Sequence, residues 1–337
     1  MTTKPTLILV PGAWHRAEIW TQVASLLEKQ HYKCVSLDLP STAGDSTKGL
    51  YDDIHAVRNA ILAETTLGRD VVLIVHSYGA AVGQSALRGL TRRYPCDLLS
   101  TSDRPTGHVI GLAMMGCGFV QTGVTVLDAM GGSPPPVWRF DESGFAQLQM
   151  DPRELFYHDV EEAEAEYWVG RLTRQSQRVL REDREYAYAG WLDVPAWYLM
   201  AGEDRMLGVG VQRVWVEGAR EVGADMTGGG DGGFYLGGGV GVCWMIWFEE
   251  FVLRWEDWRD FDDGTVEISP PFVTGCISIV ESVESSTDNT DENANISDRV
   301  VPAVTSIYII TPKYISSKAT QKDRRQKSAS LNFPTRT

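Results

Sequence analysis

A buried strand that ends in a serine-bearing turn constrains this chain more than any other feature. Residues 71–75 (VVLIV) form an apolar run that stops at His76-Ser77-Tyr78-Gly79, and small residues suited to a packed helix follow. A sharp strand-to-helix turn with serine at its apex lifts the hydroxyl clear of the backbone, as a nucleophilic serine requires. Ser77 is therefore the candidate nucleophile, and a structural serine at an ordinary strand–helix turn is the alternative.

The positions two residues before and after Ser77 must be small, because a turn of this kind is crowded. The later position is Gly79, whereas the earlier one is the branched Val75. We expect Val75 to be tolerated only where the residues facing it are small. Such residues occur in the first turns of the following helix: Ala80, Ala81 and Gly83.

A second short apolar segment, residues 6–10, ends at Pro11-Gly12-Ala13. Hydrolytic sites of this type build an oxyanion hole from backbone N–H groups that follow such a strand. Gly12 permits a tight turn there, so the backbone amides of Ala13 and Tyr78 are the candidate donors. Each donor stabilises the transition state by roughly 3 kcal/mol in comparable sites.

Apolar and amphipathic segments alternate along most of the chain up to about residue 226. Strands are expected at 6–10, 33–37, 71–75, 109–115 and 194–200, and helices at 18–30, 50–63, 80–92 and 209–222. This alternation predicts an α/β fold with a mostly parallel sheet and helices on both faces. The alternation breaks between about 126 and 190, where the charged stretch 159–171 carries apolar side chains on one side. That segment predicts a helical cap.

Four segments in combination resemble the α/β-hydrolase superfamily: LILVPGAWH, VSLDLPS, VVLIVHSYGA and the cap segment LFYHDVEEAEAEYWVGRLTRQS. The likeness runs from about Thr6 to Met226. It is nearest to small cap-bearing members, namely the plant methylesterase and hydroxynitrile-lyase-like group and related fungal hydrolases. The resemblance implies the α/β-hydrolase fold, a Ser–acid–His triad, no cofactor, and small ester substrates. A hydroxynitrile-lyase-like reaction at the same site is an alternative that also requires the histidine.

The resemblance implies that the catalytic acid lies in the loop after the strand that follows the cap. The matching residue is Asp204, and Glu203 is its local rival. Such a carboxylate fixes the tautomer of the base histidine and stabilises the imidazolium that forms during reaction. A solvated turn carboxylate without a catalytic role is the alternative interpretation of Asp204.

The base histidine cannot be assigned. The resemblance implies a histidine after the last strand, but a glycine-rich run occupies residues 228–241, and no histidine follows His158. His15 near the oxyanion hole and His158 in the cap can approach Ser77, although an ordinary structural role is favoured for both. His76 is expected to project to the opposite side of its strand. The other three histidines are placed at a strand start, an exit loop and a surface helix: His108, His31 and His55.

Two explanations for the missing base stay open. In the first, the protein is an inactive relative that binds a ligand in an intact pocket. In the second, intron or shifted-frame sequence replaces the true last strand and histidine loop from about Thr227. The abrupt change in composition at Thr227 favours the second explanation. Without a base, the Ser77 hydroxyl is a poor nucleophile at neutral pH.

Composition limits the remaining possibilities. The formal net charge of -14 argues against nucleic acid or an anionic membrane as the main partner. The N-terminal apolar segment is too short for a signal peptide, and the longest later run, 240–248, is far shorter than a membrane span. Five cysteines without paired spacing indicate neither a zinc site nor a disulfide framework. We therefore expect a cytoplasmic protein with no metal site.

The domain prediction is one α/β-hydrolase domain over 1–260, with its cap at about 126–190. Residues 227–243 form an irregular glycine-rich segment within it. Residues 261–337 are of low complexity, with an acidic Ser/Asn-rich part and a basic end, and are predicted to be a disordered tail.

The shifted-frame explanation makes a prediction that needs only DNA sequence. The genomic DNA around codons 225–250 should encode a loop with Gly-His in one of the other frames. Absence of such a loop from all three frames would eliminate this explanation and leave the inactive relative.

Overall fold

The computed structural model describes residues 4–93 and 107–226 and the backbone of a short strand at 234–236. All of them belong to the first of two compact units, Met1–Ile268. The predicted tail at 261–337 and nearly all of the predicted glycine-rich segment lie outside the described residues.

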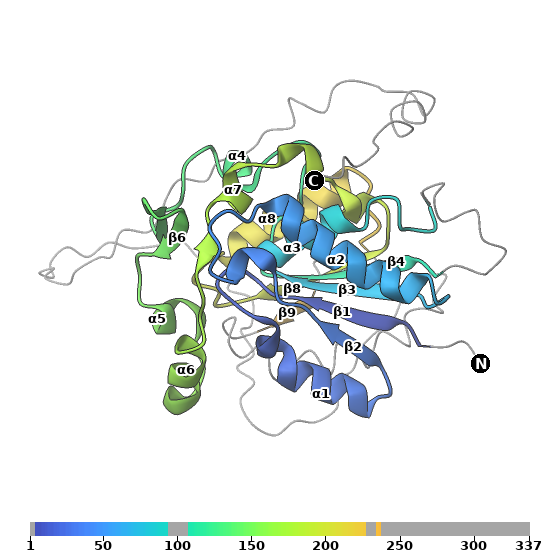
Figure 1. The fold of residues 1–337 in the computed structure, drawn as a ribbon, viewed down its shortest axis with the longest axis horizontal. Coiled ribbons are helices and arrows are strands. Elements are labelled where there is room, and N and C mark those ends of the chain that lie inside the picture. Colours follow the sequence, from blue (N-terminus) through green and yellow to red (C-terminus); the bar gives the residue numbers. More distant parts are fainter. Residues whose placement is uncertain (1–3, 94–106, 227–233, 237–337) are drawn as a thin grey trace, which may run out of the picture. The chain divides into compact units, whose positions relative to one another are not determined.

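The described strands form a six-stranded sheet in which every neighbouring pair is parallel (Figure 1). In spatial order the strands are β2 (Lys33–Ser36), β1 (Thr6–Val10), β3 (Val71–His76), β4 (Val109–Met115), β8 (Ala196–Ala201) and β9 (Phe234–Leu236). Strands β1 and β3 lie near the middle and are buried along their whole length. Their continuous apolar sequences fit a parallel sheet that is covered on both faces.

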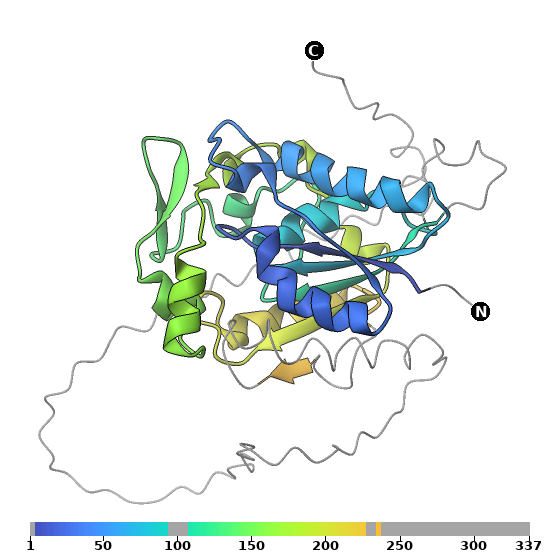
Figure 2. The same cartoon turned by 60° about the horizontal axis from the view of Figure 1, so that its bottom comes forward.

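Helices lie on both faces of this sheet, as predicted. Helix α1 (Thr21–Lys29) lies on one face, whereas α2 (Leu50–Thr65) and α3 (Tyr78–Ala86) lie on the other, as Figures 1 and 2 show. Helix α8 (Val209–Glu221) follows β8 and packs on it. The predicted strands at 6–10 and 109–115 coincide with β1 and β4.

Helix α3 is shorter than the predicted segment 80–92. It ends at Ala86, and Gly89 adopts a left-handed conformation with φ 73°. Thr91 then forms an isolated parallel bridge with Val109. Buried residues such as Leu87 and Leu90 extend the apolar pattern of the helix beyond its end. They are not part of α3, and the Leu90 carbonyl accepts a hydrogen bond from the Val109 N–H at the start of β4.

The segment over the carboxyl edge of the sheet combines helices with a small antiparallel sheet. Its helices are α4 (Val126–Ala129), α5 (Pro152–Phe156), α6 (Glu162–Val169) and α7 (Arg178–Arg181), and its strands are β5 (Trp138–Phe140), β6 (Phe145–Leu148) and β7 (Gln175–Ser176). Helix α6 confirms the predicted helix at 159–171, but the sheet was not predicted. A tight turn joins β5 to β6, in which Asp141 accepts a hydrogen bond of 2.8 Å from the Phe145 N–H and Gly144 has φ 90°.

The expected accommodation of Val75 is confirmed. A Cβ atom added to Gly83 of α3 would lie 2.5 Å from Cγ1 of Val75, closer than real Cβ contacts allow. The absent side chain at position 83 therefore provides the space that the branched side chain of Val75 occupies. The two residues act as a matched pair that lets α3 pack closely on β3.

We predict that Gly83→Ala destabilises the protein even though alanine favours a helix by about 1 kcal/mol over glycine. Overpacking a filled site costs about 1–3 kcal/mol, and the branched Val75 has little rotamer freedom to move aside. Val75→Ala in the same chain should remove most of this loss. Urea denaturation of both single variants and the double variant measures the coupling.

Gly218→Ala is the matched control, because nothing lies within 4 Å of a Cβ atom at this position in α8. It should stabilise the protein by up to about 1 kcal/mol. Equal effects of the alanine at positions 83 and 218 would contradict the proposed packing.

Candidate active site

Ser77 occupies the turn between β3 and α3 in a backbone conformation that non-glycine residues rarely adopt. Its φ is 49° and its ψ is −125°. Such strained residues persist only where the surrounding structure holds them, and they cluster at functional sites. The Ser77 N–H donates a hydrogen bond of 3.1 Å to the Met115 carbonyl at the end of β4. The residue is only partly buried, so its side chain stands at the carboxyl edge of the sheet.

Two glycines permit the close approach of the chain around Ser77. A Cβ atom on Gly79 would lie 2.3 Å from the Pro11 carbonyl oxygen. A Cβ atom on Gly12 would lie 3.1 Å from the Ser77 Cβ. The backbone leaving β1 therefore touches both the first turn of α3 and the serine, which brings Ala13 into the neighbourhood of Ser77.

The two predicted oxyanion donors lie where backbone N–H groups are available. The Tyr78 amide is the first of α3, and a helix leaves its first four amides without an intrahelical acceptor. Among the described residues, no acceptor is found for the Ala13 amide. Both residues are buried, and the partial positive charge at a helix N-terminus favours an anion. Their role as an oxyanion hole stays a prediction.

Asp204 lies in the loop after β8 and is buried, whereas its rival Glu203 is exposed. One oxygen of Asp204 accepts hydrogen bonds from the N–H groups of Met206 and Leu207, both at 2.8 Å. Burial raises the pKa of Asp204 to about 6, against the opposing effect of these two hydrogen bonds. The second oxygen lies 3.2 Å from the position that a Cβ atom of Gly116 would occupy.

The His76 imidazole lies between the two glycines that border Ser77 and Asp204. Its Nδ1 is 2.8 Å from the Cβ position of Gly12, and its Nε2 is 3.7 Å from that of Gly116. We expected His76 to project to the opposite side of its strand, and its contact with both glycine-bearing loops was not predicted. The ring is buried, and burial, followed by the neighbouring His15, lowers its pKa well below the usual value. His76 is therefore neutral at physiological pH.

His15 connects the loop after β1 to the cap. Its Nδ1 lies 2.7 Å from the Ala13 carbonyl oxygen, and its Nε2 lies 2.8 Å from the Tyr157 hydroxyl. Because a carbonyl only accepts, Nδ1 carries the proton and Nε2 accepts from Tyr157. Burial lowers the pKa of His15 to about 4, although the hydrogen bond to Ala13 opposes this shift. The Nε2 atom of His15 is thus occupied by its hydrogen bond to Tyr157 of the cap.

The other histidines occupy separate parts of the described structure. The His108 N–H donates to Asp70 at the opposite edge of the sheet, and His31 takes φ 64° in the turn after α1. His55 is exposed on α2, and His158 follows α5 in the cap. The base histidine therefore stays unassigned.

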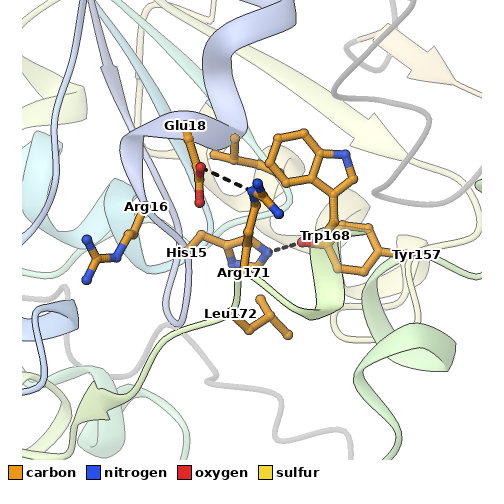
Figure 3. A pocket seen from close by; sticks show the side chains of 8 residues that line it. His15, Arg16, Glu18, Tyr157, Trp168, Arg171 and Leu172 are labelled. Atoms are coloured by element: carbon orange, nitrogen blue, oxygen red, sulfur yellow. Dashed lines mark hydrogen bonds and ion pairs between the residues drawn. The ribbon is translucent and has the colours of Figure 1, made fainter. Parts of the chain in front are cut away.

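A small, solvent-open hollow lies between the loop after β1 and the cap (Figure 3). In Figure 3 the His15 ring faces Tyr157, and Arg171 reaches Glu18, with 3.3 Å between their charged groups. Because Ser77 does not line it, this hollow borders the candidate site and does not contain the nucleophile. Its lining residues are His15, Arg16, Glu18, Ile19, Tyr157, Trp168, Arg171 and Leu172.

Two negative findings apply to the part of the chain that the structure covers. Within it, no group of three or more His, Cys, Asp or Glu side chains could hold a metal ion. No helix in that part is both long enough and apolar enough to cross a membrane.

One buried acid beside the site, Asp53, was not predicted from the sequence. Asp53 lies on the inner face of α2 among apolar residues, and it has no exposed surface. The Tyr78 hydroxyl donates to it at 2.6 Å. The available signal was an aspartate at helical spacing within an apolar stripe that also holds Leu50, Ile54, Val57 and Ile61.

Residues 7–235 match the model of the alpha/beta hydrolase family. The chain therefore belongs to the α/β-hydrolase family. The alpha/beta hydrolase nvfD of Aspergillus novofumigatus is 30% identical over 207 residues, which cover 60% of this chain and 78% of that protein. The match to the family ends at residue 235, inside the glycine-rich run 228–241 where the resemblance implies the base histidine.

Solved structures agree on the fold. The methylesterase MES16 from Arabidopsis superimposes with a TM-score of 0.54 at 16% identity, covering 75% of this chain and 99% of that one. A pyrethroid hydrolase from Sphingobium faniae gives a TM-score of 0.54 at 20% identity, covering 76% and 98%.

We predict that His15 stays a neutral Nδ1–H tautomer down to about pH 5, since burial lowers its pKa to about 4. A histidine whose pKa is lower in the folded than in the unfolded state contributes fully to the stability of the fold only above its unfolded pKa, which is near 6.5. That contribution, on the order of 3 kcal/mol, is lost as the pH falls from there towards 4. Nitrogen-15 NMR of the imidazole signals, assigned with His15→Gln, measures the tautomer and the titration. A His15 signal that titrates near pH 6.5 would contradict the buried pairing with Tyr157.

Proposed function

We propose that this α/β-hydrolase is a serine hydrolase of small apolar carboxylic esters. Ser77 is the nucleophile, Asp204 is the acid, and the amides of Ala13 and Tyr78 form the oxyanion hole. The observation that carries the proposal is the strained backbone of Ser77, with φ 49° at the junction of β3 and α3. A structural serine at an ordinary turn would not need this strain.

In this proposal the Ser77 hydroxyl attacks the ester carbonyl and forms a tetrahedral intermediate. The two amides would donate hydrogen bonds to the oxygen as negative charge develops on it. Collapse of the intermediate expels the alcohol and leaves an acyl-enzyme, which water then hydrolyses. The group that takes the Ser77 proton is unassigned, since no histidine follows His158.

An ester substrate of modest size is supported by the cap and by the structural neighbours. Aromatic side chains of the cap, among them Phe156 and Trp168, are buried close to the loop after β1. The neighbours include a methylesterase and polyneuridine aldehyde esterase, the latter with a TM-score of 0.54 at 17% identity. Buried aromatic side chains beside the loop that carries the Ala13 amide favour an apolar substrate.

A second function is favoured by one observation, the absence of any histidine after His158. A chain that lacks the base could bind the same class of ligand in its pocket without turning it over. Removal of one triad member leaves only the catalysis that binding and the oxyanion hole provide, several orders of magnitude below the intact enzyme.

We predict that a fluorophosphonate probe labels Ser77 in the folded full-length chain. Ser77→Ala should abolish the labelling, because the hydroxyl of the neighbouring Tyr78 is buried and donates to Asp53. Ser85→Ala is the matched control. It removes a buried hydroxyl of α3, which donates a hydrogen bond to the Ala81 carbonyl. Gel fluorescence and intact mass measure the extent and the rate of labelling.

The same assay separates the competing functions. Absence of labelling in a well-folded sample would favour the inactive ligand-binding relative, and release of cyanide from a cyanohydrin would favour the lyase. Asp204→Asn should change the labelling rate by less than about twofold, because no histidine follows His158, where the resemblance implies the base that such an acid would orient. A large loss would show that a histidine does reach Asp204.

Added imidazole should accelerate labelling of the wild type by supplying a base, but not that of Ser77→Ala.

A further inference from the structure

A chain of buried hydrogen bonds links the residue after the nucleophile to the cap. The Tyr78 hydroxyl donates to Oδ2 of Asp53 at 2.6 Å. Ser41, in the loop after β2, donates its hydroxyl to the same oxygen at 2.6 Å and its N–H to Oδ1 at 2.9 Å. The Gln175 side-chain amide in cap strand β7 donates to the Ser41 hydroxyl at 2.9 Å. Tyr78 and Ser41 thus donate directly to one carboxylate, and Gln175 is joined to it through the Ser41 hydroxyl.

Packing alone does not explain this carboxylate. Asp53, Ser41 and Gln175 have no exposed surface, and Tyr78 has only 7% of its surface exposed. A buried carboxylate is costly unless donors surround it, and well-packed apolar residues of similar volume often serve stability as well or better. The neighbours of Asp53 on the inner face of α2 are apolar. The carboxylate therefore points to a task other than filling the core.

The carboxylate is ionised at neutral pH in spite of its burial. Burial raises the pKa of Asp53 to about 6, while the hydrogen bonds from Ser41 and Tyr78 oppose the shift and the adjacent Asp52 adds to it. Burial and the nearby Asp53 raise the pKa of Tyr78 well above its usual value. The phenol therefore keeps its proton and remains a donor to a charged acceptor, the stronger type of hydrogen bond.

The Tyr78 side chain is held at both ends. Its backbone belongs to the strained turn at Ser77, and its hydroxyl is fixed by Asp53 on a different helix. Fixing the ring restricts rotation of the peptide that carries the Tyr78 N–H. A misplacement of about 1 Å in such a group can cost about a hundredfold in rate.

We propose that Asp53 is a positioning residue that holds the Tyr78 amide in its oxyanion-binding orientation and couples it, through Ser41 and Gln175, to the seating of the cap. The inference rests on the proposed function in one respect, the role of the Tyr78 amide as an oxyanion donor. The coupling itself is a property of the folded chain.

A second tyrosine–aspartate pair provides a matched control. The Tyr188 hydroxyl donates to Asp193 at 2.8 Å, and burial also raises the pKa of Asp193. Tyr188 lies after the cap, where its N–H bonds Ser85 of α3. Tyr188→Phe removes the same kind of hydrogen bond as Tyr78→Phe, but it leaves the turn at Ser77 unchanged.

The first measurement is hydrogen–deuterium exchange of the ligand-free full-length protein, which does not depend on catalysis. Tyr78→Phe should speed exchange of the amides in the segment 77–83 by roughly ten- to a hundredfold, the factor expected from the loss of one hydrogen bond to a charged acceptor. Tyr188→Phe should leave that segment at the wild-type rate. Equal exchange of the segment in Tyr78→Phe and wild type would overturn the proposal. Asp53→Asn is the stronger variant, but Tyr78→Phe decides the test because it keeps the buried carboxylate and two of its donors.

The second measurement is the concentration dependence of fluorophosphonate labelling, which separates the maximal rate of inactivation from the affinity for the probe. Tyr78→Phe should lower the maximal rate roughly ten- to a hundredfold and leave the affinity within about twofold. Gln175→Leu should produce a smaller loss in the same direction. Wild-type kinetics in Tyr78→Phe would overturn the positioning role. If the wild type itself is not labelled, the proposed hydrolase function fails, and the exchange comparison alone decides the positioning claim.

Discussion

The first turn of α3 lies directly on the backbone that leaves β1, and the arrangement of the candidate site depends on this contact. Gly79 meets the Pro11 and Val10 carbonyl oxygens at distances that exclude a side chain. The Cβ position of Gly12 lies 2.8 Å from Nδ1 of His76 and 3.1 Å from the Ser77 Cβ. Because both sides of the Gly79 contact are backbone, neither can move aside, and this contact helps to hold Ser77 in its strained conformation. The amides of Ala13 and Tyr78 belong to the same two segments, so the contact that strains the serine also brings them near it.

A second constraint is the exclusion of water from the groups around this contact. His15 and His76 are buried, and burial lowers the pKa of both, so they are neutral rings at physiological pH. Asp53 and Asp204 are buried as well, and burial raises the pKa of each to about 6. Preorganised donors stabilise a developing negative charge far more strongly in such surroundings than in water. The same burial makes every unpaired polar group costly, which is why His15 and Asp53 have partners on other elements.

The cap is fixed to the sheet through the loops that build the site. The Trp14 indole donates to the Ala146 carbonyl in β6 at 2.9 Å, and His15 accepts from Tyr157. Gln175 in β7 bonds Ser41 in the loop after β2. Movement of the cap would therefore disturb both the loop after β1 and the Asp53–Tyr78 pair. The position of the cap and the geometry of the turn at Ser77 are thus connected through these contacts.

The amino-acid sequence by itself determined the strands and the serine turn, and it shows that no histidine follows His158. Apolar segments such as 6–10 and 109–115 became β1 and β4 with unchanged bounds, because a strand buried on both faces is encoded by its local composition alone. The compensation of Val75 by a small residue was also predicted, since it depends on neighbours in sequence. Only the tertiary structure decided that His76 lies between Gly12 and Gly116, that His15 is committed to Tyr157, and that Asp53 supports Tyr78. These pairings join residues that are distant in sequence, and their energies come from burial and hydrogen-bond geometry, which exist only once the elements have packed.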